Sequence, residues 1–275
     1  MPGSRAPPRT ASHLVNPIVV VGASAAGTSA VEELVSLGHQ GHIVLLGAEP
    51  HRPYSRPALS KRFLSGEVLA VSLAELPAGV EFRPGTTASA VDVGRRTVTV
   101  RDTEGRVESL DYAGLVVATG CHPRRILQPA FGALTVRTID DATALGEALR
   151  PGIHVIVVGA GFLGLELATA AVRHGATVIV IDREPPLRRV LGPEISALIS
   201  RRLAAAGAAF ILEPAGISTD QDPTAGLRLP SGRCLHADVL IEAVGDHPAT
   251  TWLRGCGIPF AYRRKCPVRC LGTHL

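Results

Sequence analysis

A glycine-rich turn in the second half of the chain constrains the fold more than any other feature. A short run of β-branched apolar residues, typical of a strand buried on both faces, comes directly before Gly159, and Gly161 and Gly164 complete the spacing GxGxxG. A helical pattern follows, and then a second apolar run that ends in Asp182. A strand, turn, helix and strand in this order, closed by an acid, predict a Rossmann-like unit that binds a dinucleotide.

Each residue of this motif has its own expected role. Gly159 allows the tight turn, Gly161 leaves room for a pyrophosphate against the backbone, and Gly164 lets the helix pack closely on the strand. The phosphates would meet free N–H groups at the helix N-terminus. Asp182 lies near the position at which a carboxylate accepts ribose hydroxyls and repels a 2′-phosphate. The motif therefore predicts NADH, although Arg183 stands beside that acid.

The beginning of the chain holds a second motif of the same kind. An apolar run is followed by Gly22, Ser24 and Gly27 in the pattern GASAAG, and then by a helical stretch. Serine at the middle position is small enough for a close backbone approach. The next apolar run precedes Glu49, which is the nearest candidate for a ribose contact. The chain thus predicts two dinucleotide sites.

Composition argues against several functional classes. The formal net charge of +4 comes from Arg263, Arg264, Lys265 and Arg269 near the C-terminus, so the body of the chain offers no basic face for nucleic acid. No apolar run approaches the ~20 residues that a membrane span requires. Residues 1–16 lack the apolar core of a secretory signal and are predicted to be a disordered leader. The five cysteines show no pairing pattern, which favours a cytoplasmic protein.

A proline-rich stretch, HRPYSRPALSKRFLSGE, occupies residues 51–67. Pro53 and Pro57 exclude a long helix in its first half and predict a rigid, extended loop that leads into a short helix. Such a loop can hold Arg56 and Lys61 beside an anion. On its chemistry alone, Lys61 is slightly better explained as a solvated surface cation.

Six segments of the chain resemble one known family. They are GASAAG at the first turn, PYSRPALSK in the loop, VVATG at 116–120, VRTIDDATAL at 136–145, GAGFLGLELA at 159–168 and IEAVGDHPATTWL at 241–253. Together they resemble the FAD-dependent, NADH-using ferredoxin reductases of bacterial oxygenases, of the putidaredoxin reductase and biphenyl dioxygenase reductase type. The combination of PYxRPxLSK with GFLGLE is the most specific part of this resemblance.

The resemblance implies that electrons pass from NADH through FAD to a 2Fe–2S ferredoxin, which serves a haem monooxygenase or a Rieske dioxygenase. It implies two catalytic residues: Lys61 close to the flavin, and Glu166 near the nicotinamide. The residues implied at the FAD site are Gly22, Ser24, Ala26, Gly27, Glu49, Arg56, Lys61, Ala88, Ala118, Thr119, Gly120 and Arg137. Those implied at the NAD site are Gly159, Gly161, Phe162, Leu163, Gly164, Glu166, Asp182, Val244 and Gly245.

The expected fold is α/β, with two nested Rossmann-like dinucleotide-binding domains. An incomplete FAD-binding domain would occupy residues 17–135 and an NAD-binding domain residues 136–260. The strands expected between the two motifs are 86–93, 97–100 and 107–110, which the resemblance makes a β-meander that returns through 115–117. In the second domain we expect a helix over 194–206 and strands over 209–212, 227–229 and 239–241.

Residues 261–275 differ from the rest of the chain. They contain no acid and no strand or helix period, and we interpret them as a non-native, frameshifted tail. The return segment and interface domain of the family would then be missing, and we expect the C-terminally truncated chain to hold FAD weakly. Cys266, Cys270 and His274 could be zinc ligands, but a terminal tail without an ordering core makes a poor site, so no metal is predicted.

Two residues depart from the family pattern, and two alternatives stay open. Ser55 replaces the usual Asp of the family's loop, and Ala48 replaces an acid that often meets the FAD ribose, so either change could loosen FAD. The first alternative is a flavin disulfide reductase or NADH oxidase, which needs a redox cysteine early in the chain. No cysteine precedes Cys121, which we expect to be a small buried or half-buried thiol without a redox partner. The second alternative is a truncated product that binds nucleotide without catalysis.

Overall fold

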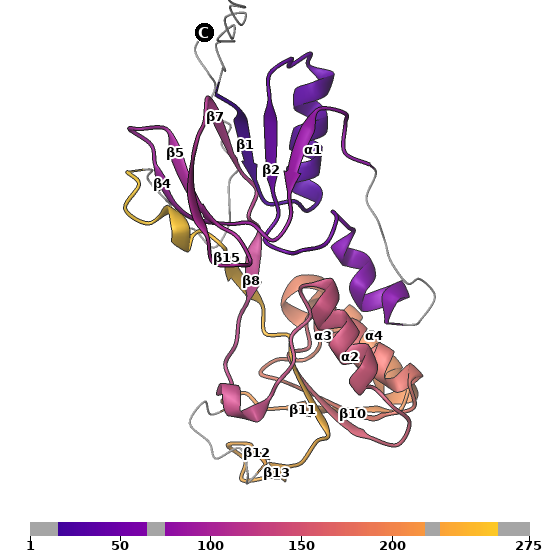
Figure 1. Ribbon diagram of the computed structural model, residues 1–275. Coiled ribbons are helices and arrows are strands. Elements are labelled where there is room, and N and C mark those ends of the chain that lie inside the picture. Colours follow the sequence, from indigo (N-terminus) through magenta and orange to yellow (C-terminus); the bar gives the residue numbers. More distant parts are fainter. Residues whose placement is uncertain (1–15, 65–74, 218–225, 258–275) are drawn as a thin grey trace, which may run out of the picture.

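The computed structural model describes residues 16–64, 75–217 and 226–257. Figure 1 shows two lobes, and each contains a four-stranded sheet. Two short strands, β8 (Cys121–Pro123) and β15 (Asp246–Pro248), pair antiparallel between the lobes, so the chain crosses from one lobe to the other there and later returns. The predicted leader up to residue 15, the predicted tail and its candidate zinc ligands lie outside the described residues.

The sheet of the upper lobe forms around the first apolar run. All of its strand pairs are parallel, and its two central strands are almost wholly buried, as expected for runs of valine, isoleucine and leucine. In sheet order the strands are β3 (Val80–Arg83), β2 (Ile43–Leu46), β1 (Ile18–Val21) and β7 (Gly114–Val117). Helix α1 (Ala25–Ser36) packs on one face through Val31.

The predicted β-meander covers the other face of this sheet. Its antiparallel strands are β4 (Thr87–Asp92), β5 (Thr97–Arg101) and β6 (Val107–Asp111). On β5 the side chains of Val98 and Val100 are buried against Val19 and Leu46 of the parallel sheet, while the alternate residues of the strand are more exposed. This alternation is typical of a strand with one solvated face.

The lower lobe repeats the topology of the upper sheet. Its parallel strands, in sheet order, are β11 (Ala208–Leu212), β10 (Thr177–Asp182), β9 (His154–Val158) and β14 (Val239–Glu242). Its helices are α2 (Ile139–Ala148), α3 (Phe162–Arg173) and α4 (Arg188–Ala205). Strands β12 (Leu227–Arg228) and β13 (Cys234–Leu235) form a small antiparallel pair. In each lobe the first strand leads into the glycine turn and a helix, and the second strand pairs beside it.

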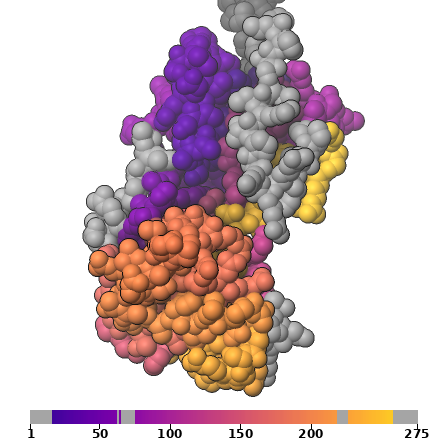
Figure 2. Space-filling model, turned by 180° about the vertical axis from the view of Figure 1, so that it is seen from behind, coloured from indigo at the N-terminus to yellow at the C-terminus, as the bar shows by residue number. Residues whose placement is uncertain are grey.

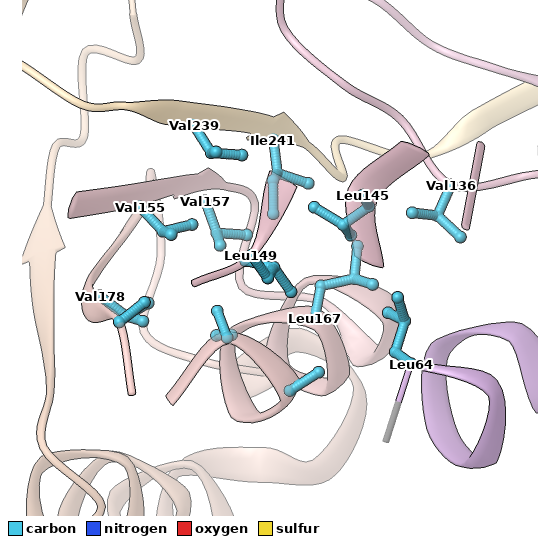
Figure 3. Close-up of a cluster of buried hydrophobic side chains, with 14 of the residues drawn as sticks. Leu64, Val136, Leu145, Leu149, Val155, Val157, Leu167, Val178, Val239 and Ile241 are labelled. Carbon is cyan, nitrogen blue, oxygen red and sulfur yellow. The ribbon is translucent and has the colours of Figure 1, made fainter. Parts of the chain in front are cut away.

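The main core of the lower lobe joins α2 and α3 to the sheet (Figure 3). Leu145 and Leu167 of the two helices pack with Val157 and Ile241 of the strands, and all four are buried. Leu64, near the end of the proline-rich stretch, belongs to the same core. The loop therefore anchors one lobe on the other.

Several elements differ from the sequence expectations. Helix α2 was not indicated by periodicity; Thr138 and Asp141 form a capping box that starts it. Helix α4 begins earlier than residue 194, but Gly192 has φ 80° and interrupts it before Pro193, so the regular part matches the predicted helix. The proline-rich loop does lead into short helical turns, η1 (Arg56–Ala58) and η2 (Leu59–Phe63).

The chain returns to the upper lobe before residue 260. The 3₁₀ turn η5 (Thr251–Leu253) packs against β4, and the yellow end of the described chain lies beside the upper lobe in Figure 2. Ala249 bonds to Gly120 and Thr119 of that lobe. The division of the chain at residues 135 and 260 stays a prediction. No helix within the described ranges has the length and apolar content needed to span a membrane.

Leu145→Ala should destabilise the protein by about 2 to 5 kcal/mol, because it removes a wholly buried side chain and leaves a cavity between α2 and the sheet. Chemical denaturation followed by circular dichroism measures the change. Leu198→Ala is the matched control, because Leu198 is 43% exposed on α4 of the same lobe. Equal destabilisation by the two variants would contradict the assignment of α2 to this core.

Candidate nucleotide sites

Both glycine turns depend on a missing β-carbon. Gly22 and Gly159 each have φ 112°, a conformation that other residues rarely adopt. A β-carbon on Gly22 would lie 2.2 Å from the carbonyl oxygen of Ala118, and one on Gly159 would lie 2.3 Å from that of Ala243. In each lobe the glycine turn therefore packs directly on the backbone at the end of the neighbouring strand.

The later glycines have two different functions. A β-carbon on Gly27 or Gly164 would lie within 2 Å of the carbonyl oxygen of the first glycine of its turn, so both glycines let helix and strand pack closely. Gly161, by contrast, has nothing within 4 Å of the position of a β-carbon. The space above the second turn is thus open to a ligand, as the motif predicts.

The helices that follow the glycine turns begin without side-chain caps. Ser24 at α1 and Gly161 at α3 make no capping hydrogen bond, and neither helix has an acid in its first turn. Helix α2 differs, because Thr138 and Asp141 bond its N-terminal groups. Uncapped N–H groups at a helix N-terminus favour an anion. The two helices after glycine turns therefore offer phosphate sites that α2 does not.

A cavity of about 440 Å³ opens beside the first turn. The predicted FAD-site residues that line it are Gly22, Ser24, Glu49, Arg56, Ala88, Ala118, Thr119, Gly120 and Arg137. Ala26 and Gly27 lie within α1 and do not line it, and neither does Lys61. Tyr54, His122 and Trp252 also line the cavity, although the sequence did not predict them there. No spacing rule could identify them, because they come from the loop, the crossing strand and the returning segment.

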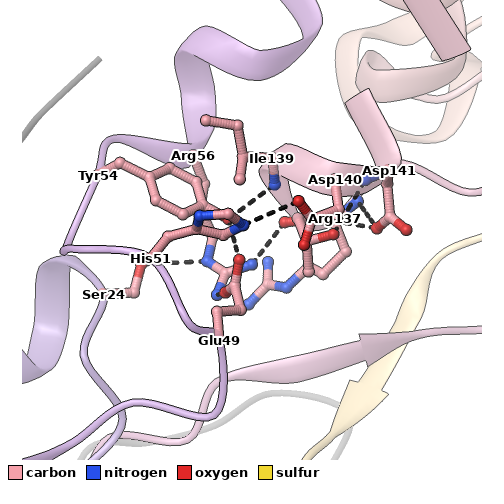
Figure 4. Close-up of polar contacts among 10 residues, drawn as sticks. Ser24, Glu49, His51, Tyr54, Arg56, Arg137, Ile139, Asp140 and Asp141 are labelled. Carbon is pink, nitrogen blue, oxygen red and sulfur yellow. Dashed lines mark hydrogen bonds and ion pairs between the residues drawn. The ribbon is translucent and has the colours of Figure 1, made fainter. Parts of the chain in front are cut away.

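Arg56 connects three elements around this cavity (Figure 4). Its guanidinium donates through Nε to Ser24 Oγ at 3.2 Å and through Nη1 to the carbonyl oxygen of Arg137 at 2.5 Å. It also pairs with Glu49, with 2.5 Å between Nη2 and Oε1. The proline-rich loop thus fixes the glycine turn, the end of β2 and the start of α2 relative to one another.

Tyr54 completes this network. Its hydroxyl donates to Glu49 Oε2 and accepts the N–H of Ile139 at 2.9 Å. Burial raises the pKa of Tyr54 well above its usual range, and the hydrogen bond to Glu49 adds to the shift, so the phenol stays protonated. Both oxygens of Glu49 are engaged by protein groups. Its predicted contact with a ribose stays a prediction, and Ala48 also lines the cavity beside it.

Arg137 differs from Arg56 in having an uncommitted side chain. Among the described residues, the hydrogen bonds of Arg137 use only its backbone groups. Its guanidinium lies beside Gly120, where a β-carbon would be 2.8 Å from Nη2. A cation that lines a cavity without an ion pair is a natural partner for a phosphate.

The two predicted catalytic residues meet between the lobes. Lys61 of η2 and Glu166 of α3 form an ion pair at 2.9 Å, and Ser60 Oγ donates to the same carboxylate at 2.5 Å. Phe162, Lys61 and Glu166 line a second cavity, of about 350 Å³, between these two helical segments. The structure brings Lys61 to this cavity rather than to the one beside the first glycine turn.

The remaining predicted NAD-site residues surround the second turn unevenly. Asp182 Oδ2 accepts the N–H of Ala160 at 2.5 Å, so its carboxylate is held against the glycine turn. Leu163 packs on the core of the lower lobe, and Val244 on the apolar cluster on the other face of the same sheet. The carbonyl of Gly245 accepts the N–H of Arg124 at the crossing between lobes.

Cys121 is half-buried, as expected. Burial raises the pKa of its thiol, and nearby Asp246 adds to the shift, so the reactive thiolate is disfavoured. Among the described residues, Cys121 and Cys256 are free cysteines. Within the described ranges, no cluster of three or more His, Cys, Asp or Glu side chains could hold a metal ion.

Tyr54→Phe should lower the free energy of unfolding by about 1 to 3 kcal/mol, because it leaves the Ile139 N–H and a Glu49 oxygen without a partner. Denaturant titration measures this loss. Tyr112→Phe is the control: Tyr112 is also buried in the upper lobe, but its hydroxyl makes no side-chain bond to a described residue. Similar losses in both variants would show that the Tyr54 network adds nothing specific.

Comparison with known proteins agrees with this geometry. The sequence matches the family model "Pyridine nucleotide-disulphide oxidoreductase" over residues 16–269. It is 34% identical over 248 residues to a probable ferredoxin reductase, CtmF, from Castellaniella defragrans. It is 30% identical over 256 residues to the ferredoxin–NAD(+) reductase subunit of the benzene 1,2-dioxygenase system of Pseudomonas putida. These alignments cover 85% and 89% of this chain.

A solved structure of the same kind of reductase also resembles this chain. The covalent putidaredoxin reductase–putidaredoxin complex matches with a TM-score of 0.79 and 27% identity, and the match covers 90% of this chain and 62% of that one. The chain also spans only 59% and 61% of the length of the two relatives. The expected resemblance to ferredoxin reductases and the α/β fold with two Rossmann-like units are confirmed. The chain belongs to the pyridine nucleotide-disulphide oxidoreductase family.

Proposed function

We propose that this chain binds FAD in the upper lobe and NADH in the lower lobe, and that it carries electrons from NADH to a ferredoxin. The observation that supports this most is the repeated glycine turn. Each lobe has one, each is followed by an uncapped helix, and the first opens on a cavity with a cation that no other described residue pairs. Two nucleotide sites in one chain suit a transfer of electrons between two nucleotide cofactors.

The upper cavity fits the shape and charge of FAD. It extends from Gly22 to Ala88 on the meander and to Gly120, so an elongated dinucleotide can lie across the ends of the strands. The turn and the N-terminus of α1 would hold the pyrophosphate, and the Arg137 guanidinium would donate to it. Bound FAD would supply the redox chemistry, because a flavin can accept a hydride and release single electrons.

In the lower lobe, Asp182 would bind the adenosine ribose of NADH. Its hydrogen bond from Ala160 fixes the carboxylate beside the turn, and a carboxylate has further acceptor sites for hydroxyl groups. The N-terminus of α3 and the open space at Gly161 would take the pyrophosphate.

Lys61 and Glu166 would position the two sites relative to each other. Their ion pair joins η2 of the upper lobe to α3 of the lower lobe. Because the Lys61 side chain is 53% exposed, the ion pair adds little to the stability of the fold. It does place one positive and one negative charge between the lobes. We propose that Lys61 thereby lies near the reactive end of bound FAD and Glu166 near the nicotinamide.

The names of the relatives support the choice of partner. Several are ferredoxin or rubredoxin reductases, and some belong to dioxygenase systems. For this chain we propose a 2Fe–2S ferredoxin that serves a haem monooxygenase or a Rieske dioxygenase in the cytoplasm. We retain the division into an FAD domain over residues 17–135 and an NAD domain over 136–260, with residues 249–253 contacting the first.

A disulfide reductase or NADH oxidase is less well supported. Such an enzyme needs a reactive cysteine, and Cys121 is the first cysteine of the chain. Its raised thiol pKa and its place in the ladder between β8 and β15 suit a packing residue.

The protein supplied with FAD should reduce a 2Fe–2S ferredoxin when NADH is added, as followed by loss of the ferredoxin's visible absorbance. Arg137→Gln should raise the FAD concentration needed for half-maximal rate roughly 10-fold to 150-fold, because one charged hydrogen bond contributes about 1.5 to 3 kcal/mol.

Arg95→Gln is the matched control, because the Arg95 side chain is 85% exposed on a hairpin of the same lobe. It should behave like the unchanged protein. Turnover of a disulfide substrate in place of ferredoxin would favour the rival reductase. Binding of both nucleotides without any turnover would favour a nucleotide-binding protein that is not an enzyme.

A further inference from the structure

The segment after Asp182 folds back onto the second glycine turn. Ala160 of that turn donates its N–H to Asp182 and accepts the N–H of Leu187 at 3.2 Å through its carbonyl. Residues 183–187 therefore form a closed loop whose two ends meet at one residue of the turn. This loop therefore lies beside the proposed ribose site.

The loop and the start of α4 carry three arginines whose charges act on Glu184. They are Arg183, Arg188 and Arg189. An acid at the end of the second strand selects against a 2′-phosphate, whereas a nearby arginine accommodates one. The sequence therefore places an acid that disfavours a 2′-phosphate beside arginines that favour one. Which nucleotide binds better depends on how these side chains pair with one another.

Glu184 neutralises one of these arginines. Its carboxylate accepts two hydrogen bonds from Arg189, one from Nη2 and one from Nε at 3.2 Å, in the forked geometry that suits a guanidinium and a carboxylate. The hydrogen bond from Arg189 lowers the pKa of Glu184, and Arg183 and Arg188 lower it further, so the pair is ionised at neutral pH. Arg189 is consequently occupied when a nucleotide arrives.

We propose that Glu184 is a specificity-determining residue, which favours NADH by holding Arg189 away from a 2′-phosphate. This inference rests on the proposed NADH site. Asp182 disfavours the phosphate directly through its own charge. Glu184 acts through a second route, because it pairs with Arg189, one of the three arginines whose charges act on it. A nucleotide with a 2′-phosphate would have to break the pair before Arg189 could bind it.

Glu184→Gln should increase the affinity for NADPH about threefold to fivefold, because an exposed ion pair of this kind is weak and its loss releases Arg189. The affinity for NADH should change less than about twofold. NADH should stay the preferred nucleotide, since Asp182 is unchanged. Titration calorimetry with each nucleotide on the full chain measures both constants.

Two further variants test the route of the effect. Glu194→Gln makes the same change of charge on the exposed surface of α4, without an ion pair to Arg189, and should leave both affinities unaltered. Glu184→Gln combined with Arg189→Gln should return NADPH affinity to that of the unchanged protein. Equal gains for NADPH and NADH, or an equal gain with Glu194→Gln, would overturn the inference while leaving the NADH site in place. Failure of the unchanged protein to bind NADH would contradict both this inference and the proposed function.

Discussion

The structure depends on the absence of a β-carbon at four glycines. At Gly22 and Gly159 the backbone lies so close to a carbonyl of the next strand end that no side chain fits, and Gly27 and Gly164 are equally restricted by the turns themselves. These close contacts bring the end of a strand and the start of a helix into one compact turn. The helix N-terminus is thereby placed at the edge of the sheet, where its unbonded N–H groups are available to an anion.

The proline-rich loop holds the two lobes, each with its own glycine turn, together. Arg56 joins the first turn to the start of α2, and Leu64 packs in the core of the lower lobe. Lys61 and Glu166 add an ion pair at the same junction. The part-buried Arg56 contacts and the buried Leu64 therefore fix the relative position of the lobes. The exposed ion pair is better suited to placing charge than to stabilising the fold.

Sequence reasoning located the parts that follow local rules. The glycine turns and the buried strands were predictable, because each has a periodicity or a spacing of its own, and the family resemblance implied that three of the strands form a meander. The Tyr54 hydrogen bonds, the pairing of Arg56 with Glu49 and the contact of Trp252 with the first cavity were not, because they join residues that only the tertiary structure brings together. Helix α2 was missed for another reason: its capping box is a clear signal, but its apolar positions are few.

In the function proposed here, the two nucleotide sites act together within one chain. Anaerobic addition of NADH to protein that carries FAD, with the visible absorbance of the flavin recorded, tests it most directly. We expect the absorbance to fall as NADH is added and about one equivalent of NADH per bound flavin to complete the change. A flavin that stays oxidised while calorimetry shows NADH bound to the same protein would contradict it.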